Sequence, residues 1–166
     1  MLYIKNGRIY TLSFSFELPE DMSIVTDPAG VSPDTLVLET YEGKYQIEIG
    51  AWTKEQSPQE QVEEYINYAS HIKMSEIFKV ERGEMKGVAA FHHTESWREE
   101  HYDERLSFPM NEDGQNTLVF AISHEIFDEK ERNGLESFIQ RPNIKRFIDS
   151  IRYETSVCEN IIKGEN

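Results

Sequence analysis

Four histidines have the residue type and spacing that come nearest to a chemical site in this sequence. His92 and His93 close one predicted strand, and His101 opens the next one after a loop of seven residues. Antiparallel pairing of these strands would bring His92 or His93 close to His101 at one rim of a sheet. His124 ends a further predicted strand and could reach the same rim. Imidazoles that converge in this way are typical zinc ligands.

The same pattern has a simpler interpretation. Successive side chains of a strand point to opposite faces, so at most one of His92 and His93 can join a shared site. Glu95 or Glu99 would then have to supply an oxygen ligand. Histidines exposed along the rim of a polar hairpin account for the spacing without any ion. We therefore expect no metal, no cofactor and no catalytic residue, and keep a metal-dependent enzyme as a less favoured alternative.

Other patterns of catalytic chemistry are weak or absent in the sequence. Asp103 and Glu104 are adjacent carboxylates, but 31 acidic residues make such pairs common, and the neighbouring Arg105 indicates a solvated face. The single cysteine, Cys158, excludes an internal disulfide and has no histidine near it in sequence. The chain contains no Gly-x-Ser-x-Gly, phosphate-loop, dinucleotide-binding or His-Glu-x-x-His pattern.

Tryptophan offers a different kind of candidate site, one for a protein partner. Trp97 lies in the middle of the charged loop 95–100, next to Arg98 and close to Tyr102, and Trp52 lies on the polar side of its predicted strand. An aromatic residue ringed by charges has the composition of a binding hot spot. The alternative is structural: Trp97 would anchor its loop, and Trp52 would pack beneath a helix.

A helix predicted over residues 57–72 separates two strand-rich halves of the chain. Ser57 can cap the first N–H groups, Pro58 suits the first helical position, and Glu60 completes a capping box. Apolar residues then recur at helical spacing and form one stripe: Val62, Tyr65, Ile66, Ala69 and Ile72. The helix is therefore expected to cover one face of a sheet.

Strand patterns fill most of the remaining chain. Alternating apolar and polar residues predict one strand over residues 10–18, closed by Pro19. Further strands are predicted at 36–41, 45–52, 77–82, 86–94, 101–108 and 117–123. Residues 118–122 are apolar on both faces, which indicates that the sheet is covered on both sides. A second amphipathic helix over residues 142–152 supplies the other layer. Small residues at Gly87, Ala89 and Ala90 are expected to let this helix approach closely.

The layout resembles the Mog1/PsbP-like family over roughly residues 8–153. The likeness is carried by the strand Phe14-Ser-Phe-Glu-Leu-Pro-Glu-Asp-Met22, the helix start Ser57-Pro58-Gln59-Glu60, the small residues Lys86-Gly87-Val88-Ala89-Ala90 and the closing helix Phe147-Ile-Asp-Ser-Ile151-Arg152. The resemblance implies an α+β protein, an α/β/α sandwich around an antiparallel sheet of about six to seven strands. It also implies a mostly non-catalytic lineage: a binder of the Ran GTPase, extrinsic photosystem subunits and chaperones of secreted effectors. Residues 1–154 would form one domain, followed by a polar tail, 155–166.

Composition restricts the class of partner. The chain has 166 residues and a formal net charge of −14. A surface this acidic repels phosphate backbones and anionic lipids. We therefore expect neither nucleic acid nor membrane as a partner, whereas a basic protein is permitted.

The N-terminal residues lack an apolar run of signal-peptide length, and a single cysteine suits a reducing compartment. We therefore expect a cytoplasmic protein.

These observations favour a non-enzymatic domain that binds another protein, as an adaptor or a chaperone does, through a sheet face or a rim loop. A small-molecule binding module is the alternative, with the sheet face and the loop 19–33 forming its pocket. The sequence leaves the oligomeric state open.

Overall fold

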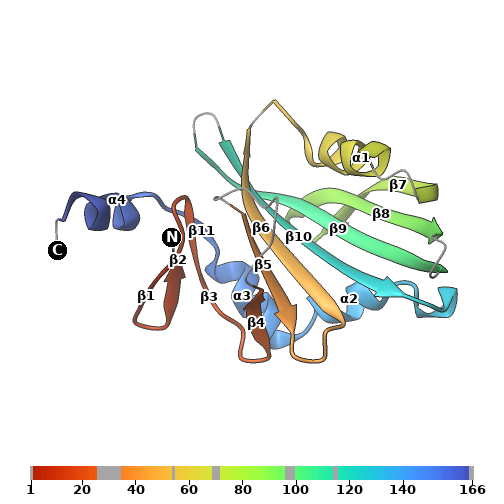
Figure 1. Cartoon of the computed structure of the whole chain (residues 1–166), viewed down its shortest axis with the longest axis horizontal. Helices are drawn as coiled ribbons and strands as arrows, with labels where there is room; N and C mark the ends of the chain where they lie inside the picture. The colour runs from red at the N-terminus through yellow and green to blue at the C-terminus, as the bar shows by residue number, and fades with distance from the viewer. Residues whose placement is uncertain are drawn as a thin grey trace.

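A large antiparallel sheet forms the body of the molecule (Figure 1). The computed structural model describes residues 2–25, 35–53, 55–68, 72–95, 100–113 and 116–164. Within these residues the sheet has seven strands in the order β4-β5-β6-β10-β9-β8-β7. The strands are β4 (Met22–Val25), β5 (Thr35–Thr40), β6 (Tyr45–Thr53), β7 (Ile72–Arg82), β8 (Met85–Glu95), β9 (Glu100–Asp113) and β10 (Asn116–Ile126). The predicted α+β class and the central antiparallel sheet are confirmed.

A second, smaller sheet corrects the prediction for the N-terminal region. It has the order β1-β2-β3-β11, with β1 (Tyr3–Lys5), β2 (Arg8–Tyr10), β3 (Phe14–Glu17) and β11 (Arg152–Tyr153). The single strand predicted over residues 10–18 is wrong, because the chain reverses between β2 and β3. The Thr11 hydroxyl makes the turn: it donates to the Phe14 carbonyl at 3.0 Å and accepts from the Phe14 N–H at 3.1 Å.

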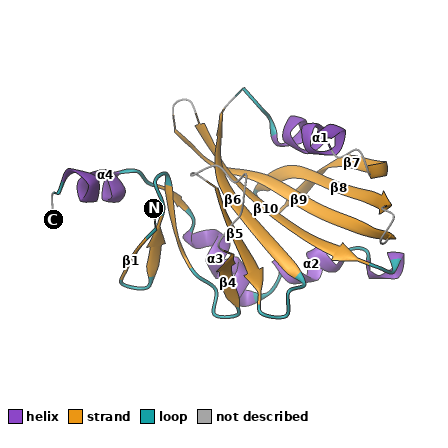
Figure 2. Ribbon diagram, viewed as in Figure 1, coloured by secondary structure: helices purple, strands orange, loops and turns teal. Residues whose placement is uncertain are grey.

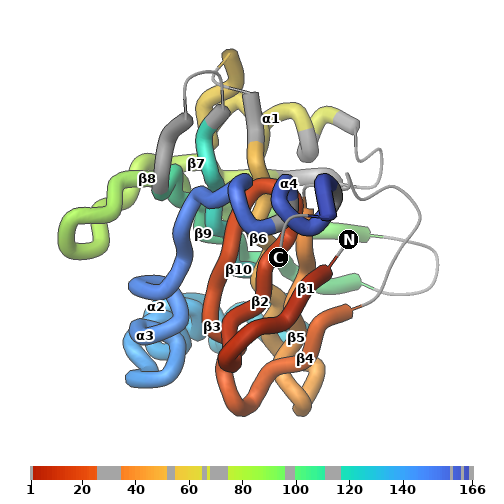
Figure 3. Tube along the Cα trace, turned by 90° about the vertical axis from the view of Figure 1, so that its left-hand side faces the viewer, coloured from red at the N-terminus to blue at the C-terminus, as the bar shows by residue number. Residues whose placement is uncertain are grey.

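Helices lie on both sides of the large sheet (Figure 2). α1 (Pro58–Tyr68) contacts β7, β8 and β9 from one side, whereas α2 (Gly134–Ile139) contacts β9 and β10 from the other. α3 (Pro142–Ser150) follows α2 and lies next to β3 when the molecule is viewed from the side (Figure 3). A short 3₁₀ helix, η1 (Glu129–Glu131), precedes α2. No helix in the described part of the chain has the length and apolar character needed to span a bilayer.

Two helix predictions need correction at their C-terminal ends. Ile72, predicted as the last residue of the first helix, instead begins β7. The helix predicted over 142–152 stops at Ser150, because Ile151 is extended and fully buried and Arg152 pairs with β3. The stretch predicted to be a polar tail contains α4 (Ser156–Lys163), which lies away from the large sheet (Figure 1).

The main core lies between the large sheet and the layer formed by α2, α3 and β3. All five residues of the predicted two-sided strand segment 118–122 are buried, as expected. The Phe147 ring of α3 meets the Phe16 ring edge-on at 5.6 Å between centroids and lies 6.1 Å from the Phe120 ring of the large sheet. One aromatic side chain therefore joins both sheets and the helix between them.

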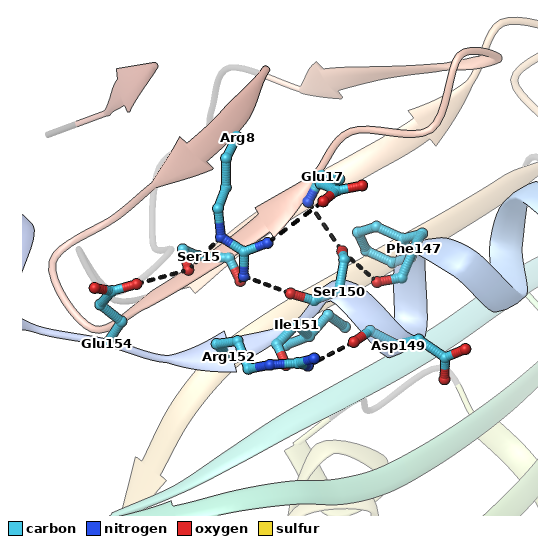
Figure 4. Close-up of polar contacts among 9 residues, drawn as sticks. All are labelled: Arg8, Ser15, Glu17, Phe147, Asp149, Ser150, Ile151, Arg152 and Glu154. Atoms are coloured by element: carbon cyan, nitrogen blue, oxygen red, sulfur yellow. Dashed lines mark hydrogen bonds and ion pairs between the residues drawn. The ribbon is translucent and has the colours of Figure 1, made fainter. Parts of the chain in front are cut away.

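Polar contacts complete this junction (Figure 4). The Arg8 guanidinium donates to the Ser15 hydroxyl at 2.9 Å and to the Ser150 carbonyl at 2.5 Å. The Ser150 hydroxyl accepts from the Glu17 N–H at 2.9 Å and donates to the Phe147 carbonyl at 2.6 Å. These bonds satisfy carbonyl groups at the end of α3, which a helix terminus otherwise leaves without partners.

The strands β8 and β9 are packed too closely at Gly87 to leave room for a side chain. A Cβ atom at this position would collide with the Ser107 carbonyl oxygen of β9 and would lie 2.6 Å from Phe108 Cδ1. The neighbouring strand, not the approach of the 142–152 helix, therefore requires glycine here.

We expect Gly87→Ala to lower the free energy of unfolding by about 1–3 kcal/mol, measured by urea denaturation, because the added methyl group overpacks the core. Lys86→Ala, an exposed neighbour, is the control; an equal loss in both variants would contradict this explanation.

The capping box of α1 gives a pH-dependent prediction. The Ser57 N–H donates to the Glu60 carboxylate at 2.7 Å, and this bond, with a smaller contribution from the Ser57 side chain, lowers the pKa of Glu60. A lowered pKa stabilises the folded state above the unfolded pKa, and this stabilisation is lost as the pH falls through the folded value. We expect wild type and Glu60→Gln to differ in unfolding free energy near neutral pH and to converge in acid. A difference between the two proteins that stays the same from neutral pH into acid would contradict this explanation.

Candidate functional site

The pairing register of three strands places the candidate side chains in rows across the sheet. His92 of β8 lies directly opposite Asp103 of β9, and Asp103 lies opposite Glu125 of β10. Directly opposite residues of an antiparallel sheet point to the same face. His92, Asp103 and Glu125 therefore share one face, and it is the face that α1 partly covers.

Asp103 is the centre of this group. Its Oδ2 atom lies 3.5 Å from His92 Nε2 and 3.3 Å from His101 Nε2, and it accepts a hydrogen bond from the Thr94 hydroxyl at 2.9 Å. His101 Nε2 also lies 3.6 Å from Glu125 Oε2. We call these five residues the Asp103 cluster. His92 is buried and Glu125 is exposed, so the cluster runs from the interior to the surface.

Two cavities open beside the Asp103 cluster. One, of about 360 Å³, lies between α1 and the sheet, where Gln61 and Val62 face a polar floor. On that floor Arg105 donates to the Glu48 carboxylate at 3.0 Å. The other cavity, of about 210 Å³, is lined by Asp103 and Glu125 together with Gly43, Lys44, Gln46, Ser123 and His124. Asp103 contributes to both walls, so the cluster is accessible to small solutes.

His93 lies on the opposite face, as the alternation of strand side chains requires. Its Nε2 atom is 2.7 Å from Glu100 Oε1, and its ring stacks on Tyr102 at 4.8 Å between centroids. Tyr102 also stacks on Phe91, at 5.4 Å. Tyr102 is thus held between two rings, and His93 is separated from the Asp103 cluster by the sheet itself.

His124 does not join the Asp103 cluster either, because it too points to the opposite face. It lies opposite Glu104, and its Nε2 atom is 2.6 Å from Glu104 Oε2. The other Glu104 oxygen accepts from the Asn133 N–H at 2.7 Å, just before α2 begins. A side chain at Gly134 would have no room, since its Cβ would lie 2.7 Å from His124 Cε1. This buried pair joins β9 and β10 to α2.

The remaining predicted residues divide between described and undescribed parts of the chain. Trp97, Arg98 and Glu99 lie outside the described residues, and so does the side chain of Trp52, a residue of β6. Glu95 is exposed at the end of β8. Sequence reasoning did not select Thr94 or Glu125 as site residues and treated Asp103 as part of a chance pair. The exact pairing of β9 with β8 and with β10 was the missing signal, because it decides which carboxylates face the histidines.

The donor atoms of the Asp103 cluster are imidazole nitrogens and carboxylate oxygens. One ligand atom each from His101, Asp103 and Glu125 lie within 4.8 Å of one another. Such a set can bind a divalent cation or exchange protons.

Two glutamates of β9 provide a matched test of the buried pair. Glu104 and Glu100 each lie within 2.7 Å of a histidine Nε2, but their side chains are 10% and 63% exposed. We expect Glu104→Gln to lower the unfolding free energy by about 1–3 kcal/mol, because a buried charged hydrogen bond is lost. Glu100→Gln should change it by less than about 1 kcal/mol, because surface pairs contribute little. Thermal and urea unfolding would measure both; equal effects would mean that burial is unimportant here.

Comparison with known proteins identifies the fold. No protein-family model matches the sequence, and no curated protein matches it. A solved structure of a Mog1 mutant superposes with a TM-score of 0.56 at 8% identity, covering 87% of this chain and 93% of that one. The Ran-binding protein Mog1p of Saccharomyces cerevisiae superposes with a TM-score of 0.54 at 10% identity, covering 94% and 98%. The chain therefore has the Mog1/PsbP-like fold, as its layout predicted.

Proposed function

We propose that this chain is a non-enzymatic, cytoplasmic protein-interaction domain that binds a basic protein through an acidic rim. The acidic rim consists of exposed carboxylates close in sequence to Phe127 or to His101, whose ring lies 6.2 Å from the Phe127 ring: Glu100, Glu125, Asp128, Glu129 and Glu131. The observation that carries the proposal is the exposure of Phe127, a large aromatic residue that is 66% accessible.

Phe127 differs from other exposed apolar residues by its surroundings. Single exposed apolar side chains are normal on protein surfaces. Phe127, however, follows β10 directly, and its ring lies 6.2 Å from the His101 ring at the start of β9. The ends of two strands therefore place an aromatic residue next to His101, shortly after Trp97 and Arg98 in the sequence, the residues that sequence analysis predicts to bind a partner. An aromatic centre with a polar margin is the usual anatomy of a protein interface.

The charge of the rim indicates the chemistry of the partner. Lys130 is the exposed cation within the segment from Glu125 to Glu131, where four residues are acidic. Complementary charge accelerates association and excludes partners of like charge. A protein that presents Lys or Arg residues around an apolar pocket fits this rim, whereas an acidic protein would be repelled.

The fold is consistent with such a role. One of the solved structures compared above is described as a Ran-binding protein. At this low identity the likeness extends to the fold alone, so the partner is inferred here from the rim and not from that description.

A small-molecule binding role is the second candidate, and the cavity beneath α1 favours it. Its volume of about 360 Å³ is within the range of small-ligand pockets, roughly 300–1,000 Å³. The sequence analysis expected this pocket between the sheet face and the loop 19–33. Met22 in that loop is fully buried, and residues 26–34 lie outside the described residues.

Site-specific photo-cross-linking in cells tests the proposed interface. A benzoylphenylalanine introduced at Phe127 should yield one predominant cross-linked protein, and high salt should reduce the yield. The same probe at Ile4 is the control, because Ile4 is equally exposed, at 66%, but lies on the small sheet at the other end of the molecule (Figure 1).

The cross-linked protein then permits a direct measurement. We expect Phe127→Ala to weaken its binding about 10- to 30-fold, as truncation of a hot-spot aromatic does. Equal cross-linking from both positions, or unchanged affinity in Phe127→Ala, would contradict the proposal.

A further inference from the structure

We propose that the Asp103 cluster binds a divalent transition-metal ion of the zinc class. His101, Asp103 and Glu125 supply the ligand atoms, and water completes the coordination. This inference concerns a metal site and stands independently of the protein partner proposed above.

The separations between ligand atoms carry the proposal. In a tetrahedral site with metal–ligand distances of about 2.0–2.1 Å, neighbouring ligand atoms are about 3.3–3.4 Å apart. His101 Nε2 lies 3.3 Å from Asp103 Oδ2 and 3.6 Å from Glu125 Oε2. The third separation, from Asp103 to Glu125, is within 4.8 Å. Two edges of the ligand triangle therefore already have nearly the length that a bound ion requires, and a small movement of the exposed Glu125 closes the third.

The other histidine–carboxylate pairs show that these separations are distinctive. His124 Nε2 is hydrogen-bonded to Glu104 Oε2 at 2.6 Å, and His93 Nε2 lies 2.7 Å from Glu100 Oε1 as a close ion pair. The contacts of His101 with Asp103 and Glu125 are longer than a hydrogen bond of good geometry. On one face each histidine thus lies close to a single carboxylate, whereas on the other face His101 lies at a longer distance from two carboxylates.

Neighbouring residues supply what a metal site needs beyond its ligands. The Thr94 hydroxyl donates to the Asp103 carboxylate at 2.9 Å, and His92 Nε2 lies 3.5 Å from the same oxygen. Such contacts orient a metal-binding carboxylate and are important for affinity. The cavity of about 210 Å³ lined by Asp103 and Glu125 gives the ion a route from solvent.

The ligand types select the kind of metal. Imidazole suits zinc, cobalt, nickel and copper, whereas calcium and magnesium prefer six or more oxygen ligands. Three protein ligands also leave a coordination position open, unlike closed structural zinc sites with four. The site is therefore expected to take up Zn²⁺ or Co²⁺ and to discriminate against Mg²⁺ and Ca²⁺.

Metal titration of the untagged, chelator-treated full chain tests the proposal. We expect calorimetry to show that the chain binds one equivalent of Zn²⁺. We expect bound Co²⁺ to produce the visible absorption of a low-coordinate cobalt site. Mg²⁺ and Ca²⁺ should not compete. His101→Gln and Asp103→Asn should each weaken Zn²⁺ binding at least about 100-fold, since loss of a direct ligand exceeds the 10- to 100-fold effect of an outer partner.

His93→Gln is the matched control, because His93 lies between His92 and Thr94 of the cluster in sequence but faces the other side of the sheet. It should bind Zn²⁺ as wild type does. Circular dichroism and thermal unfolding without metal would verify that each variant is folded. The proposal is overturned if wild type takes up no Zn²⁺, if folded His101→Gln binds it as tightly as wild type, or if His93→Gln loses binding equally.

Discussion

The pairing register of β8, β9 and β10 is the constraint on which the rest of the structure depends. Across five neighbouring strands it aligns Glu76, Phe91, Glu104, His124 and Tyr45 in one row on the core face. The adjacent row, on the other face, contains His92, Asp103 and Glu125. A shift of one residue would exchange the two faces of a strand. The same register therefore decides which residues form the core and which carboxylates meet the histidines.

The two faces of the large sheet have different roles. The face beneath α2 and α3 carries the large apolar residues, including Phe108, Phe120 and Ile122, all fully buried. The other face carries small and polar residues such as Ala121, Ser107 and Arg105 beneath the single helix α1. Because burial of apolar surface on one side supplies most of the stabilisation, the other side can accommodate histidines, carboxylates and cavities.

The errors in the predicted fold share a physical cause. Alternation of apolar and polar residues continues through the turn at Thr11, so residues 10–18 have the pattern of one strand although the chain reverses there. A hydroxyl bonded to nearby backbone makes this turn, and no glycine or proline marks it. The last residues of α3 were misassigned for a similar reason: Ile151 fits the helical stripe, but its burial and the pairing of Arg152 with β3 favour extended backbone.

Local pattern in the sequence was sufficient for the α+β class, for the start of α1 at its capping box, for β8 to β10 within a few residues and for the burial of residues 118–122. It also required adjacent histidines to lie on opposite faces, since side-chain alternation is a local property of any strand. Tertiary structure decided the second sheet, the placement of His124 beside Glu104 and the assembly of His101, Asp103 and Glu125. These depend on contacts between segments far apart in sequence, and periodicity within one strand carries no information about the register of its neighbour.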